Sequence, residues 1–302
     1  MIQSIINRFI ILLTPILPLS FVRIIAGKYV AGEDQAEVLS IAKELNDKGY
    51  SITIDILGEH SKTPSIARAV TKQYIKLLKS IYFDNLDCNI SIKPTHLGLD
   101  ISKDCVWENL LSLLKVAEDT HNFLRIDMES SAVTDDTIEF YQKCKEQYPE
   151  VGTVFQAYLY RSKDDLKTLS KESNVNFRLC KGIYRETLDI AIQDRQKINN
   201  NFISLLRYAL KNNIYVCIAT HDLDLVEKAY QLIIELNVPS DRFEFQVLYG
   251  VPMSGWLERH LQNGYKVRIY LPFGKDWYSY SHRRLKENPN IAGYILKNIF
   301  RK

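Results

Sequence analysis

Side chains capable of acid–base chemistry or ligand binding follow the short apolar segments of this sequence. They are Glu59, Lys93, Asp127 with Glu129, Gln156, Arg178 with Lys181, Thr220 with His221, Gln246 and Tyr270. If these cations, carboxylates, amides and aromatic rings share one cavity, they suit a charged small substrate together with a polar cofactor. The segments that carry them must then bring one end of each to a common face.

Arg178 carries the clearest signal in this set. It lies inside the apolar segment 176–181, where an unpaired guanidinium is costly to bury. We therefore expect an anion or an electron-rich acceptor beside it. Other positions also allow structural roles, since Lys93 could extend from a strand end into solvent and Asp127 could cap the loop that follows. Gly182 would let a flat ligand approach the backbone, or would serve a turn.

The last helical segment holds a second group of polar side chains. At spacings of i, i+3, i+4 and i+7 it carries Tyr280, Arg283, Arg284 and Glu287. This spacing places all of them on one helical face. Two adjacent guanidiniums suit a carboxylate, because the planar fork of arginine forms paired hydrogen bonds with it. The alternative is a solvated helix in which Arg283 and Glu287 form a weak surface pair.

After Gly49, eight β-branched runs alternate with segments of helical period. The predicted strands are 51–57, 89–93, 123–128, 153–159, 176–181, 214–220, 243–248 and 267–271. Several are apolar almost throughout, as expected of strands buried on both faces. One helical stripe comprises Leu225, Ala229, Leu232, Ile233 and Leu236. Thr63 ahead of Pro64 predicts a helix start.

Repeated strand–helix units require parallel strands, and eight parallel strands close into a filled barrel. The predicted fold class is therefore α/β, a (βα)8 barrel of the TIM type over residues 51–302. A helical segment, residues 1–50, precedes it, and no linker or shift of composition divides the chain. Catalytic groups in this fold gather at the carboxyl ends of the strands, where the polar side chains described above lie.

The composition is that of an ordinary globular chain. Of the 302 residues, 46% are hydrophobic and 25% are charged, which excludes disordered, collagen-like and polytopic membrane proteins. A formal net charge of +3 gives no reason to expect nucleic acid as a partner. The five cysteines are far apart and odd in number, so we expect buried thiols in a reducing, cytoplasmic compartment.

Segment 9–19 is the most apolar stretch of the chain. It is too short for an ordinary transmembrane helix and is interrupted by Pro15 and Pro18. We expect a short helix packed on the domain. The alternative is a peripheral contact with a membrane surface, because Arg8 and Arg23 flank the apolar residues.

Other chemistries have weaker support in the sequence. GxGxxG, Walker A, GxSxG and HExxH motifs do not occur. A metal site of a hydrolase could be formed by His60, His96 and His221 with Glu59. These residues cluster poorly along the sequence, however, and we expect no metal. Lys93 or Lys181 could form a Schiff base in a barrel aldolase.

Several motifs give the sequence a family resemblance. They are DILGE (55–59), SIKPTHLGLDI (91–101), RIDMES (125–130), GTVFQAYLYRS (152–162), FRLCKGIYRE (177–186), IATHD (218–222), FEFQVLYG (243–250) and VRIYLPFGKDWYSYSHRRLKENP (267–289). In these motifs the chain resembles the monofunctional bacterial proline dehydrogenases. The resemblance implies a (βα)8 barrel whose last helix lies over the barrel mouth.

The resemblance also implies FAD, bound without a Rossmann motif. The cofactor-binding positions it carries over are Met128, Gln156, Arg178, Lys181, Gly182, Ile183, Tyr184, Thr220, His221, Gln246 and Glu287. Arg178 would stand near the flavin N5. Lys93, Arg283 and Arg284 would bind the carboxylate of L-proline, and Tyr270 and Tyr280 would pack against its ring. Asp127 would orient Lys93 and Tyr270, so that Asp127, Arg178 and Tyr270 form the catalytic set.

The implied reaction is oxidation of L-proline to Δ1-pyrroline-5-carboxylate, the first step of proline degradation to glutamate. A hydride would pass from proline C5 to flavin N5, and a quinone would accept the electrons. Ile183 stands where alanine is frequent in the family and Asp222 where asparagine is common, so Ile183 could alter flavin affinity or substrate preference. The alternatives are a flavin dehydrogenase of a proline analogue such as hydroxyproline, or a binding protein that kept the pocket.

We expect Arg284→Lys to weaken proline binding while FAD is retained. The loss of one charge-assisted contact should cost about 1–3 kcal/mol of apparent affinity. Steady-state kinetics with proline, together with the flavin absorbance of the purified variant, measure both quantities. Unchanged kinetics would contradict the assignment of Arg284 to the carboxylate.

Overall fold

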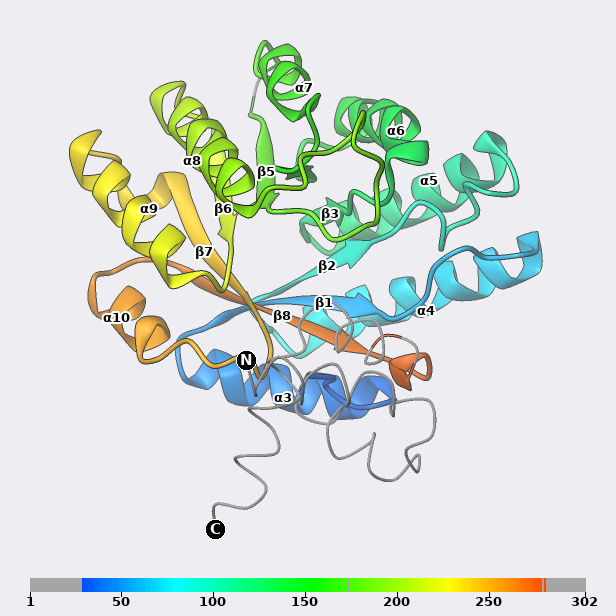
Figure 1. Ribbon diagram of the computed structural model, residues 1–302. Helices are drawn as coiled ribbons and strands as arrows, with labels where there is room; N and C mark the ends of the chain where they lie inside the picture. Colours follow the sequence, from blue (N-terminus) through cyan, green and yellow to red (C-terminus); the bar gives the residue numbers. More distant parts are fainter. Residues whose placement is uncertain (1–28, 173, 279, 281–302) are drawn as a thin grey trace, which may run out of the picture.

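The computed structural model describes residues 29–172, 174–278 and 280 of the chain. Within these residues eight parallel strands close into a barrel in chain order, and β8 pairs with β1 (Figure 1). The strands are β1 Ser51–Ile56, β2 Cys88–Ile92, β3 Leu124–Ile126, β4 Val151–Gln156, β5 Asn176–Cys180, β6 Tyr215–Ala219, β7 Phe243–Leu248 and β8 Val267–Phe273. The predicted barrel is confirmed.

Helices follow the strands and surround the barrel (Figure 1). They are α4 Pro64–Phe83, α5 Lys103–Asp119, α6 Thr134–Gln147, α7 Ser162–Leu169, α8 Arg195–Lys211, α9 Leu223–Glu235 and α10 Trp256–Gln262, with the 3-10 turns η1 Ser131–Val133 and η2 Ser240–Arg242. Ahead of the barrel, α3 (Gln35–Asp47) packs beside β1 and β8. None of the helices in the described ranges is long and apolar enough to cross a membrane.

Local sequence explains where these elements begin and end. Thr63 caps α4, since its side chain accepts a hydrogen bond from the amide of Ile66 with Pro64 in the first turn. The apolar stripe of α9 is buried as predicted, except that the helix ends at Glu235 and Leu236 forms its cap. Gly49 and Asn213 adopt positive φ angles of 88° and 55° just before β1 and β6, where the chain reverses.

The third and fourth strands differ most from the prediction. The third strand is shorter than 123–128 and comprises Leu124–Ile126, although the amide of Asp127 still donates to the carbonyl of Ile92 at 2.9 Å. The fourth begins at Val151 and ends at Gln156. Beyond it, Ala157 stays in the main core, whereas Tyr158 and Leu159 pack in a small cluster with Ala191. An apolar run alone does not show where a strand ends, because its side chains are buried whether the residues continue the strand or pack in the loop that follows it.

Buried arginines lie inside the strands, and their partners come from neighbouring strands. Arg125 of β3 is 2% exposed. Its Nη1 donates to the carbonyls of Thr153 (2.8 Å) and Asn176 (3.0 Å), and its Nη2 donates to Asn176 Oδ1 (2.6 Å). Gly152 faces this guanidinium, and a Cβ there would collide with Nη1 and lie 2.7 Å from the carbonyl oxygen of Asn176. The glycine therefore provides the space that Arg125 occupies.

We expect Gly152→Ala to destabilise the barrel by about 2–3 kcal/mol, the upper part of the range for overpacked cores. The methyl group would displace Arg125 from its carbonyl acceptors. Gly264→Ala is the matched control, because a Cβ there meets nothing within 4 Å and the φ of +72° costs about 1 kcal/mol. Denaturant unfolding measures both variants. A loss at Gly152 no larger than at Gly264 would contradict the crowding argument.

Candidate active site

Side chains from β1, β5, β7 and β8 meet those that follow β2 and β3. We call this group the central cluster: Asp55, Lys93, Asp127, Arg178, Gln246 and Tyr270. Its members are joined by direct hydrogen bonds or ion pairs. All of them except Asp55 were expected at this face from the strand-end argument, and the structure places them together.

Asp127 joins most of the central cluster. Its Oδ1 accepts hydrogen bonds from Arg178 Nη1 at 2.7 Å and from Ser91 Oγ at 2.6 Å. Its Oδ2 accepts one from the Tyr270 hydroxyl at 3.1 Å. Burial opposes ionisation, but the positive charges of Arg178 and Lys93 outweigh it and lower the pKa of Asp127. The carboxylate is therefore charged at neutral pH while it accepts the hydrogen bond of Tyr270.

Lys93 is held by two carboxylates. Its Nζ lies 2.8 Å and 2.7 Å from the two carboxylate oxygens of Asp55, and 3.7 Å from Asp127 Oδ2. Burial alone would lower the pKa of Lys93, yet these carboxylates raise it above its ordinary value. A charged ammonium is a poor nucleophile, which disfavours a Schiff base on Lys93.

Asp55 is the member of the central cluster that sequence reasoning missed. It lies inside β1 and is 2% exposed, so the strand-end argument passed over it. Burial raises the pKa of Asp55, with Lys93 acting in the opposite direction. The signal that could have found it is a carboxylate inside an otherwise apolar strand. The same reasoning, applied to Arg178, predicted an anion or an electron-rich acceptor, and the structure places Asp127 and Gln246 beside it.

Arg178 is fixed by contacts on three sides. Its Nε donates to Gln246 Oε1 at 2.6 Å, its Nη1 donates to Asp127, and its guanidinium stacks 4.9 Å from the centre of the Tyr270 ring. Its Nη2 is buried without an acceptor among the described residues. This remaining donor distinguishes Arg178 from Arg125, whose two terminal nitrogens both have acceptors in the barrel.

Gln156 also has one unmet hydrogen-bonding group. Its Nε2 donates to the main-chain oxygens of Met128 (2.9 Å) and Glu129 (3.1 Å). Its Oε1 is buried with no donor among the residues that the structure describes. The Glu129 side chain is engaged by Thr95, whose amide and hydroxyl donate to it, while burial raises the pKa of Glu129 to about 6.

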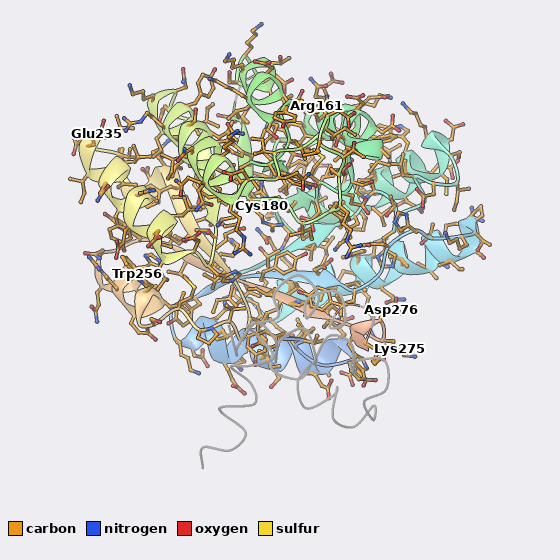
Figure 2. The ribbon with its side chains drawn as sticks, in the orientation of Figure 1. Arg161, Cys180, Glu235, Trp256, Lys275 and Asp276 are labelled. Atoms are coloured by element: carbon orange, nitrogen blue, oxygen red, sulfur yellow. The ribbon has the colours of Figure 1, made fainter. Side chains whose placement is uncertain are left out.

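The loop after β5 carries the next expected cofactor positions. Cys180 ends β5 and is labelled in Figure 2. Lys181 Nζ then pairs with Asp222 at 2.5 Å. Gly182 has a φ of +106°, and a Cβ on it would collide with the Tyr158 ring, so the turn and this packing both require glycine. Ile183 is 47% exposed, and Tyr184 follows it in the same loop, which Glu186 ties to η1 through Ser131.

The remaining expected residues lie around the same face or outside the described ranges. The Thr220 hydroxyl accepts a hydrogen bond from the amide of Asp222, and His221 Nε2 accepts one from the amide of Leu248. Tyr280 is buried with Val30 and Leu57. It follows β8 in the chain, a few residues after Lys275 and Asp276, which Figure 2 labels. Outside the described residues lie Arg283, Arg284, Glu287 and the apolar segment 9–19.

The three histidines considered for a metal site have different surroundings. His60 Nδ1 lies 2.7 Å from Asp100, and His221 Nε2 accepts a hydrogen bond from the amide of Leu248. His96 is buried, which lowers its pKa to about 4. Across the described ranges no group of three or more histidine, cysteine, aspartate or glutamate side chains is placed to hold a metal ion.

Comparison with known proteins identifies the family. The family model described as "Proline dehydrogenase" matches residues 38–295. "Proline dehydrogenase 1" of Bacillus subtilis subsp. natto is 36% identical over 93% of this chain and 92% of its own length. The proline dehydrogenase of Deinococcus radiodurans is 30% identical over 92% of this chain and 90% of its own.

A solved structure has the same barrel. It is proline utilization A (PutA) from Bdellovibrio bacteriovorus inactivated by N-propargylglycine, with a TM-score of 0.82 and 24% identity. The match covers 91% of this chain and 34% of that one, so it bears on the fold alone. The matches in sequence, unlike this one, run over nearly the whole chain at 30–36% identity. The chain therefore belongs to the proline dehydrogenase family of oxidoreductases.

Proposed function

We propose that the protein oxidises L-proline to Δ1-pyrroline-5-carboxylate with FAD as its cofactor and a quinone as the electron acceptor. The amine of proline loses its proton, and C5 gives up a hydride, so that a C5–N double bond forms in the product. FAD supplies the two-electron acceptor for that hydride at N5. Membership of the proline dehydrogenase family supports the substrate.

One observation carries the cofactor proposal. Arg178 Nη2 is a buried donor and Gln156 Oε1 a buried acceptor, and neither has a partner among the described residues. Buried polar groups in native proteins are nearly always satisfied, so these two atoms call for a polar ligand. The edge of an isoalloxazine ring offers both acceptors and a donor, which fits this pair. Arg178, Gln156, Lys181 and Gln246 would hold it, and the positive charge of Arg178 would stabilise negative charge on the reduced ring.

The charge of the central cluster explains why further cations are needed for the substrate. Counted at their formal charges, Asp55 and Asp127 contribute −2, and Lys93 and Arg178 contribute +2, so the sum is zero. The carboxylate of proline adds a negative charge that this neutral set does not compensate. Arg283 and Arg284 would supply the missing positive charge, with Lys93 held in place by Asp55 as a third contact. Tyr270 and Tyr280 would bound the ring of the substrate.

The electron acceptor and the location follow from the same proposal. A quinone dissolves in the lipid bilayer, so a cytoplasmic enzyme that reduces it must reach the membrane surface. The apolar, basic-flanked segment 9–19 is the candidate for such a peripheral contact.

We expect the purified protein to be yellow and its flavin band to bleach when L-proline is added without oxygen. The reason is that proline would transfer two electrons to the bound FAD. Absorption spectra before and after addition measure this directly. A colourless protein that takes up no added FAD would refute the cofactor, and bound proline without bleaching would indicate a binding protein. Faster bleaching by hydroxyproline would indicate the analogue as substrate.

Asp127→Asn should lower kcat/KM for proline by roughly 10- to 150-fold, the value of one charge-assisted hydrogen bond of about 1.5–3 kcal/mol. An amide cannot balance the charge of Arg178, and its NH2 group would face donors. Ser91→Ala is the matched control, since Ser91 donates a neutral hydrogen bond to the same Oδ1, and its loss should cost about 1 kcal/mol. Steady-state kinetics of the two flavin-loaded variants test this. Equal losses in both would show that the charge of Asp127 is unimportant.

A further inference from the structure

A second buried ion pair lies inside the barrel, next to the central cluster. Glu244 of β7 and Arg268 of β8 are 2% and 7% exposed. Arg268 Nε donates to Glu244 Oε1 at 2.8 Å, and its Nη1 donates to the carbonyl of Ile52 at 2.8 Å. The Tyr215 hydroxyl donates to the other oxygen, Oε2, at 3.2 Å. Burial opposes ionisation of Glu244, but Arg268 outweighs it and lowers the pKa of Glu244 to about 2, so the carboxylate is charged.

Glu244 contacts the central cluster through Gln246. The two residues are two apart on β7, so their side chains point to the same face of the strand. Gln246 Nε2 donates to Glu244 Oε1 at 2.6 Å, and Gln246 Oε1 accepts from Arg178 Nε at 2.6 Å. Glu244 Oε1 is therefore shared between Arg268 and the amide of Gln246.

The orientation of this amide follows from the charges on either side of it. An ionised carboxylate offers acceptors and no donor, and a guanidinium offers donors and no acceptor. Turning the Gln246 amide over would set its oxygen against Glu244 and its NH2 group against Arg178. Both contacts would become repulsive, so Glu244 and Arg178 together permit one orientation.

We propose that Glu244 is a positioning residue that acts through Gln246 on Arg178. Gln246 holds Arg178 Nε while Asp127 holds Nη1, and these two anchors fix the plane of the guanidinium. The remaining donor, Nη2, is thereby directed to the site where the proposed function places the flavin. This inference rests on that proposed function for its effect on the cofactor, but the effect on Arg178 itself does not depend on a bound ligand.

A purely structural ion pair would behave differently. If Glu244 served stability alone, its replacement would lower the free energy of unfolding and leave the flavin and Arg178 unchanged. The positioning role would instead affect the chemical step, because Arg178 would face the reacting ring of the bound flavin. The groups proposed for the proline carboxylate are different ones, Lys93, Arg283 and Arg284. Replacing Glu244 should therefore lower kcat and leave KM for proline almost unchanged.

The test uses the full-length, FAD-loaded protein with Glu244→Gln and the double variant Glu244→Gln/Arg268→Gln. The double variant leaves no unpaired buried charge, so it keeps the experiment valid if the single variant fails to fold. Tyr215→Phe is the matched control, because it removes a hydrogen bond to Oε2 of the same carboxylate and leaves Oε1 untouched. The readouts are the flavin midpoint potential, kcat and KM for proline, and NMR hydrogen exchange of Arg178 Nε–H in the apoprotein.

We expect both Glu244 variants to show a more negative midpoint potential, about a tenfold lower kcat with KM within about twofold, and faster exchange of Arg178 Nε–H. Tyr215→Phe should match the wild type in all three readouts. Wild-type values in the Glu244 variants, or the same changes in Tyr215→Phe, would overturn the positioning role. A wild-type protein that binds no FAD would instead refute the proposed function, and the exchange of Arg178 Nε–H would still decide whether Glu244 positions Arg178.

Discussion

Charged side chains inside the barrel need hydrogen-bonding or ionic partners from other strands, and this constraint shapes both the interior and the site. Arg125, Arg178 and Arg268 all lie within strands and are less than one-tenth exposed. A buried guanidinium without partners is costly. Arg125 is satisfied mainly by main-chain and amide oxygens, Arg268 by Glu244, and Arg178 by Asp127 and Gln246. Closing the barrel in the correct register is what brings these partners together.

The partners of one of these three arginines, Arg178, are incomplete among the described residues. Arg125 and Arg268 have acceptors for the nitrogens that the barrel interior surrounds, whereas Arg178 retains a buried donor, Nη2, with no acceptor in the described part of the chain. Gln156 retains a buried acceptor. Two buried hydrogen-bonding groups thus have no partner within the described ranges at the place where the proposed cofactor would bind, although leaving such groups unpaired costs free energy.

Much of the fold could be predicted because its signals are local. The alternation of β-branched runs with helical stripes and the cap at Thr63 each depend on a few neighbouring residues, and both were confirmed. The ends of β3 and β4 were less predictable, because in each case the apolar run of the sequence continues beyond the end of the strand into a loop whose side chains are also buried. In the site, an anion or an electron-rich acceptor beside Arg178 was predicted from the cost of burial. Asp55 and Glu244 were overlooked because both are carboxylates inside otherwise apolar strands, and the burial argument was applied only to Arg178.

By itself the sequence determined the number and order of the strands, the face at which polar side chains gather and the resemblance to proline dehydrogenases. These follow from periodicity and from motifs, which need no knowledge of distant contacts. Tertiary structure alone decided which charges meet: that Lys93 lies between Asp55 and Asp127, and that Gln246 connects Glu244 to Arg178. The physical reason is that electrostatic partners are chosen by distances of a few ångströms between strands far apart in the chain, and such distances exist only once the barrel has closed.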